Sequence, residues 1–228
     1  MSTPSASPPS ADRGATEHPW REIDLDVYER HMSDARVGQL QLLSEITRDQ
    51  LTSTPARRLG ILGIAGGNGL DVIDPEQIDA VFGYDINADY LVACAARFGR
   101  KFGDRLVLTE ACIDGHSMIE PVGLLIANLF IEYVGLDEFL AFLAANAGGI
   151  GVVSCVIQRN QAESFVSSTE QASAFNRLSS IASDIDVDAL ENAMVALGFL
   201  CNHSSDHALP NGKALLRRDF LVSPVGDS

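Results

Sequence analysis

Mainly apolar runs alternate along this chain with segments of helical periodicity. Such runs occupy residues 57–64, 80–85, 105–113, 122–131 and 151–158. Strands that are buried on both faces lack the polar alternation of half-exposed strands, and they form parallel sheets covered by helices. The alternation therefore predicts an α/β fold with a doubly wound, mainly parallel, Rossmann-like sheet. Residues 200–222 add an antiparallel C-terminal hairpin around the turn sequence PNG, which brings the expected sheet to seven strands.

The helical spacing of apolar residues predicts the layers that cover this sheet. Between Ile23 and Leu51 it predicts two helices divided at Gly38, and further helices are expected at 87–103, 136–146 and 186–199. We expect residues 20–55 to form an N-terminal helical cap and the serine-rich residues 159–185 to form a helical insertion that acts as a lid. Residues 1–19, rich in Ser, Pro and Ala, predict a disordered tail. Residues 20–228 are then a single domain, since no linker divides them.

The charge balance argues against one class of partner. The chain holds 31 acidic and 16 basic residues, with a formal net charge of −15. Nucleic-acid binding needs clustered Lys and Arg, so nucleic acid is not expected as a main partner. The N-terminus lacks the apolar core of a signal peptide, and NAGG interrupts the uncharged stretch at 139–157, so no membrane segment is expected. We expect a cytoplasmic protein whose four scattered cysteines are reduced core residues.

The stretch LGIAGGNGLD, residues 62–71, places four glycines directly after the first apolar run. Glycine costs conformational entropy on folding, so such a cluster indicates a sharp turn or the close approach of a ligand. Ligands of doubly wound sheets bind beyond the carboxyl ends of the strands, beside the first strand. Asp85 ends the second run, where a carboxylate can accept hydrogen bonds from both hydroxyls of a ribose. A tight strand-to-helix connection and a helix cap at Asp85 are the structural alternatives.

The order of this glycine loop, GYDIN, LLIANLFIEY and the closing hairpin resembles class I S-adenosylmethionine-dependent methyltransferases, over about residues 28–222. The stretch YERHM…VGQLQLL resembles a less characterised bacterial branch in which a helical segment precedes the cofactor domain. The resemblance implies S-adenosylmethionine as the cofactor and a small molecule as the methyl acceptor.

The first motif of the family, Asp/Glu-x-Gly-x-Gly-x-Gly, falls on the glycine loop. Its defined positions are occupied by Gly63, Ala65, Gly67 and Gly69, so that Gly63 stands where the family has an acidic residue. The resemblance implies that this loop, with Gly66 and Asn68 between those positions, lies against the cofactor.

Other cofactor contacts follow from the same resemblance. It assigns the ribose to Asp85 and places Ile86 beside the adenine. It assigns the adenine amino group to Asp114, with Glu110 as the alternative register.

The methyl-transfer end of the site is expected after the fourth apolar run. Asn128 stands at the Asn of the Asn-Pro-Pro-Tyr motif of amino-methylating members, although Leu129 and Phe130 replace the prolines. Glu132 and Tyr133 follow and are expected to orient the acceptor or to take a proton from it.

Tyr28 and His31 lie on one face of the first predicted helix. We expect Tyr28 to contact the cofactor and His31 to act at the methyl-transfer site, packing of the helix on the core being the alternative. HSSDH, at 203–207, brings two histidines and an Asp together, but it lies in a predicted hairpin and no metal site is expected.

Methyl transfer to a small molecule is therefore the leading functional hypothesis. An NAD(P)-dependent oxidoreductase is the runner-up, because a glycine loop followed by an Asp serves either cofactor. A protein that binds S-adenosylmethionine without catalysis is the third, since Gly63 replaces an acidic residue of the motif. A homodimer is compatible with all three.

Overall fold

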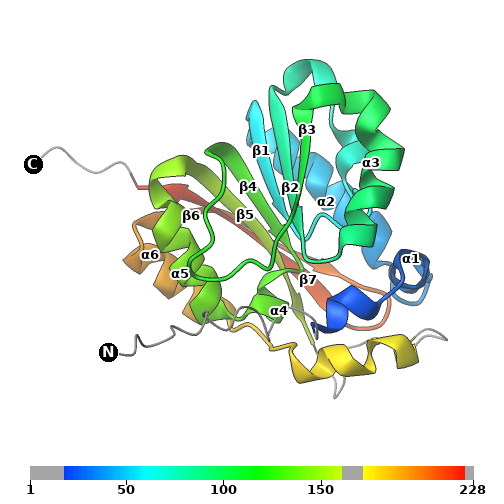
Figure 1. Ribbon diagram of the computed structural model, residues 1–228. Helices are drawn as coiled ribbons and strands as arrows, with labels where there is room; N and C mark the ends of the chain where they lie inside the picture. Colours follow the sequence, from blue (N-terminus) through cyan, green and yellow to red (C-terminus); the bar gives the residue numbers. More distant parts are fainter. Residues whose placement is uncertain (1–17, 161–171, 224–228) are drawn as a thin grey trace, which may run out of the picture.

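The computed structural model describes residues 18–160 and 172–223. Seven strands of these residues form a single sheet (Figure 1). The strands are β1 Arg58–Leu62, β2 Ala80–Asp85, β3 Leu106–Glu110, β4 Val122–Asn128, β5 Ile150–Arg159, β6 Phe199–Ala208 and β7 Ala214–Val222.

The strand order is β3-β2-β1-β4-β5-β7-β6. Neighbours from β3 to β5 pair in parallel, whereas β7 is antiparallel to both β5 and β6. From β1 the chain first moves outward to β3 and then returns to β4 on the other side. The sheet is therefore doubly wound with a switch point between β1 and β4, and the predicted fold class, including the closing hairpin, is confirmed.

Helices cover both faces of the sheet (Figure 1). On one face Leu43 and Ile46 pack near Val156 of β5, and Leu91 packs near Ile61 of β1. On the other face, Phe139 and Leu190 join a cluster with residues of β4 and β5. The helices of the first face are α1 Leu25–Ser33, α2 Gln39–Ser53 and α3 Ala88–Phe102, and those of the second are α4 Ile131–Val134, α5 Leu136–Asn146 and α6 Val187–Ala196.

Helix ends follow signals that the sequence carries. Gly38 has φ +66° and precedes α2, which explains why the predicted N-terminal helical pattern divides there. The side chain of Asn87 accepts hydrogen bonds from the backbone N–H groups of Asp89 and Tyr90 at the start of α3. At the start of α6, the side chain of Asp186 accepts them from the next N–H groups in the same way. These side chains satisfy N–H groups that a helix leaves without an internal partner.

The segment after the glycine loop contains no α-helix. Two short 3-10 helices, η2 Leu70–Val72 and η3 Pro75–Gln77, connect the loop to β2. Proline at the first position of η3 and the left-handed φ of +90° at Gly69 interrupt a longer helix here.

Several helices and strands begin or end at other residues than the sequence predicts. The fourth run ends as a strand at Asn128 because Leu129 adopts φ +52°, and α4 follows. In the predicted helical insertion, β5 extends to Arg159 and residues Ala172–Ser180 form the 3-10 helix η6, whereas 161–171 lie outside the described residues. Residues 1–17 of the predicted tail also lie outside them, whereas His18 is described and Pro19 begins η1, Pro19–Glu22. Cys112 and Cys201 are exposed, so the prediction that every cysteine is a core residue is wrong for these two.

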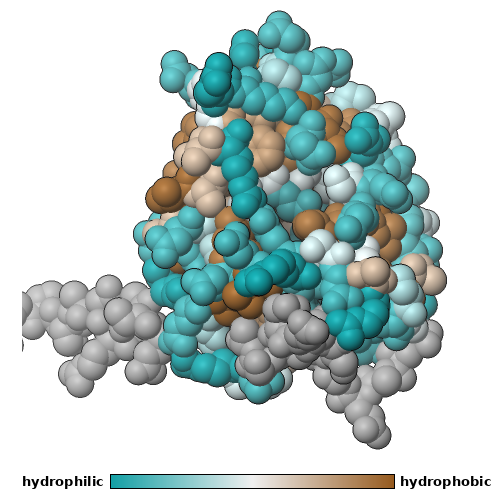
Figure 2. Space-filling model, turned by 90° about the vertical axis from the view of Figure 1, so that its right-hand side faces the viewer, coloured by the Kyte–Doolittle hydropathy of each residue, from teal (hydrophilic) through white to brown (hydrophobic). Residues whose placement is uncertain are grey.

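The face that carries α1 and α3 is mostly hydrophilic, with apolar residues gathered in separate patches (Figure 2). Across 18–160 and 172–223, no helix combines the length and apolar character needed to cross a membrane.

Candidate functional site

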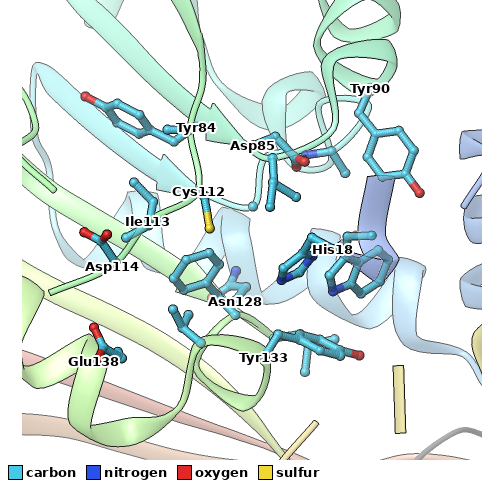
Figure 3. A pocket seen from close by; sticks show the side chains of 18 of the residues that line it. His18, Tyr84, Asp85, Tyr90, Cys112, Ile113, Asp114, Asn128, Tyr133 and Glu138 are labelled. Atoms are coloured by element: carbon cyan, nitrogen blue, oxygen red, sulfur yellow. The ribbon is translucent and has the colours of Figure 1, made fainter. Parts of the chain in front are cut away.

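A cavity of about 290 Å³ lies at the carboxyl ends of β1, β2 and β4 (Figure 3). We call it the larger cavity, because a smaller cavity that is described below adjoins it. Its walls come from the glycine loop, the segment after β3, the segment after β4, and the N-terminal residues 18–28. The predicted site residues among its lining are Tyr28, Gly63, Ala65, Asp85, Ile86, Asp114, Asn128 and Tyr133.

Asp85 is fixed at the end of β2 by the neighbouring backbone. Its Oδ2 accepts a hydrogen bond from the N–H of Ala65 at 2.8 Å, and its Oδ1 accepts one from the N–H of Asn87 at 2.9 Å. Burial raises the pKa of Asp85, and these N–H groups partly oppose that rise. An ionised carboxylate can accept about four hydrogen bonds, so Asp85 keeps capacity for ligand hydroxyls.

The glycine loop divides between two surroundings. Gly63, with φ +65°, and Ala65, with φ +48°, line the larger cavity. Gly66, Gly67 and Asn68 line a separate depression beside α1 and α3.

Gly67 and Gly69 are held close to the neighbouring helices. A Cβ on Gly67 would lie 2.5 Å from Phe98 of α3, and one on Gly69 would lie 2.7 Å from Thr47 of α2. In this structure the close approach at these two glycines is therefore made by protein side chains. The predicted cofactor contacts of Gly66, Gly67, Asn68 and Gly69 stay predictions.

Aromatic rings form one side of the larger cavity. Trp20 makes edge contacts with Tyr28 at a centroid distance of 5.6 Å and with Tyr133 at 5.0 Å. Tyr28 stacks on Tyr90 at 6.1 Å. Rings of this kind favour a cationic or π-rich ligand.

Asn128 lines the larger cavity, but its amide is engaged with α2. Its Oδ1 accepts from Nε2 of Gln50 at 2.9 Å, and its Nδ2 donates to Oε1 of Gln50 at 3.1 Å. The same Nε2 of Gln50 donates to Ser154 of β5 at 2.8 Å. Asn128 is thus held at the end of β4 by paired hydrogen bonds to the amide of the buried Gln50.

The segment after β3 lies opposite the aromatic side. Asp114 accepts hydrogen bonds from the hydroxyl of Ser117 and the N–H of His116, both at 2.9 Å, which closes a tight turn. Glu138 of α5 accepts from the N–H of Gly115 at 2.8 Å and fixes this turn against the helix. Asp114 and the thiol-bearing Cys112 both border the cavity (Figure 3).

A second cavity, of about 60 Å³, adjoins the first, and we call it the smaller cavity. Trp20, Tyr28, Leu129 and Tyr133 line both cavities. The predicted residues His31 and Glu132 line only the smaller one, together with Phe175 and Leu178 of η6. The structure therefore brings Asn128 and Tyr133 to the larger cavity and places Glu132 behind them.

Glu132 is completely buried. Its Oε1 accepts from the N–H of Gln158 at 2.6 Å, whereas its Oε2 has no hydrogen-bond partner among the described residues. Burial, together with the negative charge of Asp184, raises the pKa of Glu132 to about 7, although backbone hydrogen bonds partly oppose the rise. A buried carboxyl with such a pKa is characteristic of functional sites.

His31 packs against Phe175 with ring centroids 4.6 Å apart. Burial lowers the pKa of His31, and the positive charge of Lys213 lowers it further. The imidazole is therefore neutral at pH 7.

Two residues that line the larger cavity carry a buried polar atom without a partner among the described residues. The atoms are the hydroxyl of Tyr90 and Nδ1 of His18. Because buried polar groups are almost always hydrogen-bonded, these atoms indicate a polar ligand.

In the described part of the chain, no group of three or more His, Cys, Asp or Glu residues is arranged to hold a metal ion. His203 and His207 instead bracket Ser205 on β6, at 3.3 and 3.0 Å from its hydroxyl.

A scan against protein-family models gives no match, and no curated protein matches the sequence. Solved structures do match. Magnesium protoporphyrin IX methyltransferase from Synechocystis PCC 6803, with bound S-adenosylhomocysteine, is 12% identical and gives a TM-score of 0.63 over 87% of this chain and 94% of its own. The 1,6-didemethyltoxoflavin-N1-methyltransferase of Burkholderia thailandensis is 13% identical and gives 0.61 over 96% of this chain and 93% of its own.

The chain has the class I methyltransferase fold. The [4+2]-cyclase SpnF matches as well, at 11% identity and a TM-score of 0.60 over 80% of this chain and 81% of its own. One fold thus carries different chemistries, and function has to be argued from the site.

Several residues that border the cavities of this methyltransferase fold were not predicted. Trp20 is the single tryptophan of the chain, and its place at the end of the Pro- and Ser-rich tail is a signal that an aromatic residue has a packing or binding role there. Phe175 and Leu178 carry no comparable signal, because they approach the cavity only through the fold of η6. The other unpredicted lining residues include His18, Tyr84, Tyr90, Cys112, Ile113, Glu138, Gln39 and Gln158.

Proposed function

We propose that the larger cavity binds S-adenosylmethionine and that the protein transfers its methyl group to a small molecule. The observation that carries this proposal is the position of Asp85. Its carboxylate borders the cavity at the carboxyl end of β2, directly beside Ala65 of the glycine loop. This is where the dinucleotide-type fold uses an acidic residue for ribose hydroxyls.

The residues around Asp85 fit the other parts of the cofactor. Ile86 and the buried Ile113 offer apolar surface for adenine, and Asp114 offers a carboxylate for its amino group. The ring faces of Tyr28 and Tyr133 suit a sulfonium, which is a cation. The bound cofactor supplies an electrophilic methyl group.

The protein's own contribution is to orient the acceptor and to exclude water. Trp20, Tyr28 and Tyr133 lie between the two cavities, and an apolar cluster of Ile23, Phe175 and Leu178 packs against them. An ion pair between Glu22 and Arg177 joins η1 to η6 across this cluster. Such a cover suits an in-line displacement, which gains from fixed geometry and a dry site. We also propose that the predicted cap, residues 20–55, and the predicted lid, residues 159–185, belong to a single domain together with the sheet.

An NAD(P)-dependent oxidoreductase has less support. A dinucleotide pyrophosphate binds at the N-terminus of a helix that follows the glycine loop. Here the loop is followed by the three-residue η2. S-adenosylmethionine carries no phosphate and does not need that helix.

Labelled methyl transfer tests the proposal. Purified protein is incubated with methyl-labelled S-adenosylmethionine and fractionated small-molecule extracts, and S-adenosylhomocysteine formation is followed. We expect label to pass into a small-molecule fraction. Binding of S-adenosylmethionine with no product in any fraction would support a non-catalytic binding protein. Saturable binding of NAD without binding of S-adenosylmethionine would support the oxidoreductase.

A further inference from the structure

The smaller cavity holds a polar atom whose partner is missing from the described protein. Glu132 Oε2 is buried and unpartnered, although Oε1 of the same carboxylate is held at 2.6 Å by the N–H of Gln158. An ionised carboxylate accepts hydrogen bonds but cannot donate them. No N–H or O–H group of the described residues donates to this oxygen, and a ligand can supply that donor.

Among the described residues, no positively charged group acts on the pKa of Glu132. The charged neighbour that acts on its pKa is Asp184, which has the same sign. His31, which lines the same cavity, is neutral because burial lowers its pKa. A ligand that carries or develops positive charge would therefore be stabilised here.

Aromatic rings form much of the remaining wall, beside apolar side chains and two amides, namely Met32, Leu129, Leu178, Gln39 and Gln158. Trp20, Tyr28 and Tyr133 approach from the side of the larger cavity, and Phe175 closes the opposite side against His31. Aromatic rings beside an anion are a common environment for amines, since ring faces attract a cation that the anion pairs with. A phenol or alcohol donor would use Glu132 but would gain less from the rings.

We propose that the smaller cavity is the acceptor subsite and that it takes an amine nitrogen bearing at least one N–H. The inference rests on the proposed methyl transfer and adds the chemical class of the acceptor. The N–H donates to Glu132 Oε2, and the nitrogen faces the larger cavity past the shared residues Trp20, Tyr28 and Tyr133.

The proton balance follows from this placement. Transfer joins the acceptor nitrogen to the methyl carbon while the carbon–sulfur bond breaks and leaves its electron pair on sulfur. The proton that the nitrogen then loses goes to Oε2 of Glu132, which the structure leaves free to receive it.

Ligand-observed NMR on the full-length protein saturated with S-adenosylhomocysteine tests the proposal. The probes are a fragment set of matched trios in which an amine, an alcohol and a hydrocarbon share one small skeleton. We expect amines to bind in preference to their alcohol and hydrocarbon counterparts and to compete for one site. Equal binding by the alcohols, or no binding by any amine of the set, would overturn the proposal.

Variants locate the site. Glu132→Gln keeps an acceptor for the N–H of Gln158 but removes the charge, and it should weaken amine binding at least tenfold. Glu45→Gln makes the same change on an exposed residue of α2 and should have no effect. Phe175→Leu removes an aromatic wall of the smaller cavity alone and should weaken amine binding while leaving affinity for S-adenosylhomocysteine unchanged. Undiminished amine binding in folded Glu132→Gln would contradict the proposal.

The two proposals fail differently in this design. Binding of S-adenosylhomocysteine without any binding of amines removes the acceptor assignment and leaves the proposed cofactor site intact. Absence of S-adenosylhomocysteine binding removes the proposed function, whereas the amine titrations can still be read on the free protein.

Discussion

Glu132 carries its carboxyl group in surroundings that disfavour charge. It lies in α4 behind Tyr133, with no exposed surface and with one oxygen unpartnered among the described residues. Keeping such a group costs folding free energy, which a hydrocarbon or amide at this position would avoid. This cost is expected where a buried group serves binding or chemistry.

The pKa of Glu132 gives a stability prediction with a defined sign. Its folded-state pKa of about 7 lies above the ordinary value of 4.5, so the folded protein binds more protons between these pH values. The free energy of unfolding therefore falls as pH rises through this window. Glu132→Gln should have little effect at pH 5 and should stabilise the protein by about 2–3 kcal/mol at pH 8. Urea unfolding at both pH values measures this, with Glu45→Gln as the control that should not change. A variant less stable than the wild type at pH 8 would contradict the account.

At the scale of elements, the glycine loop is shaped by the helices beside it. Gly67 and Gly69 have φ values of +95° and +90°, and side chains of α3 and α2 occupy the space where a Cβ would lie. These glycines let the loop pack against both helices while Gly63 and Ala65 face the larger cavity. The spacing of glycines in the sequence identifies the loop, but it does not show whether a protein side chain or a ligand lies close to each glycine.

Alanine at these glycines should therefore lower stability. Gly67→Ala and Gly69→Ala combine backbone strain with overpacking, and each should cost about 1–3 kcal/mol in the free energy of unfolding. Gly99→Ala is the control within α3, where nothing lies near the added methyl group. It should stabilise the protein by up to about 1 kcal/mol. If Gly67→Ala keeps wild-type stability and loses only cofactor affinity, the close approach is made by the cofactor instead.

For the whole molecule, much of the fold follows from local patterns. The run 80–85 and the helix 136–146 match β2 and α5 residue for residue, because an unbroken apolar run and a regular helical pattern have clear ends. The carboxyl edge of the sheet, with Asp85 and Asn128, could be predicted for the same reason.

The sequence predicts a cap and a lid, but it does not predict which side chains join them over the site. The cover depends on contacts between Trp20, Tyr133 and Phe175, which are far apart in the chain and carry no shared periodicity. The separation of Glu132 from the larger cavity arises at Leu129, directly after β4, whose left-handed φ turns the chain toward α4. Such a conformation for leucine is rare and leaves no sequence signal.

The net charge of −15 also acts on the molecule as a whole. Self-repulsion among the excess carboxylates destabilises the folded state, and exposed ion pairs such as Arg57–Asp79 contribute little to its stability. Raising NaCl from about 20 mM to about 500 mM shortens the Debye length to a few ångströms. We expect the Tm to rise by a few degrees, as measured by scanning calorimetry. A falling Tm would mean that specific ion pairs outweigh the general repulsion.

Calorimetric titration of S-adenosylhomocysteine into the wild-type protein and Asp85→Ala tests the central claim most directly. We predict one site in the wild type and no saturable binding of NAD. Removing charge-assisted hydrogen bonds to the ribose should cost about 1.5–3 kcal/mol, which weakens binding roughly 10- to 150-fold in Asp85→Ala. Circular dichroism checks that the variant is folded, since Asp85 also holds the N–H groups of Ala65 and Asn87. Absence of binding to the wild type, or equal affinity in the folded variant, would contradict the assignment of the larger cavity.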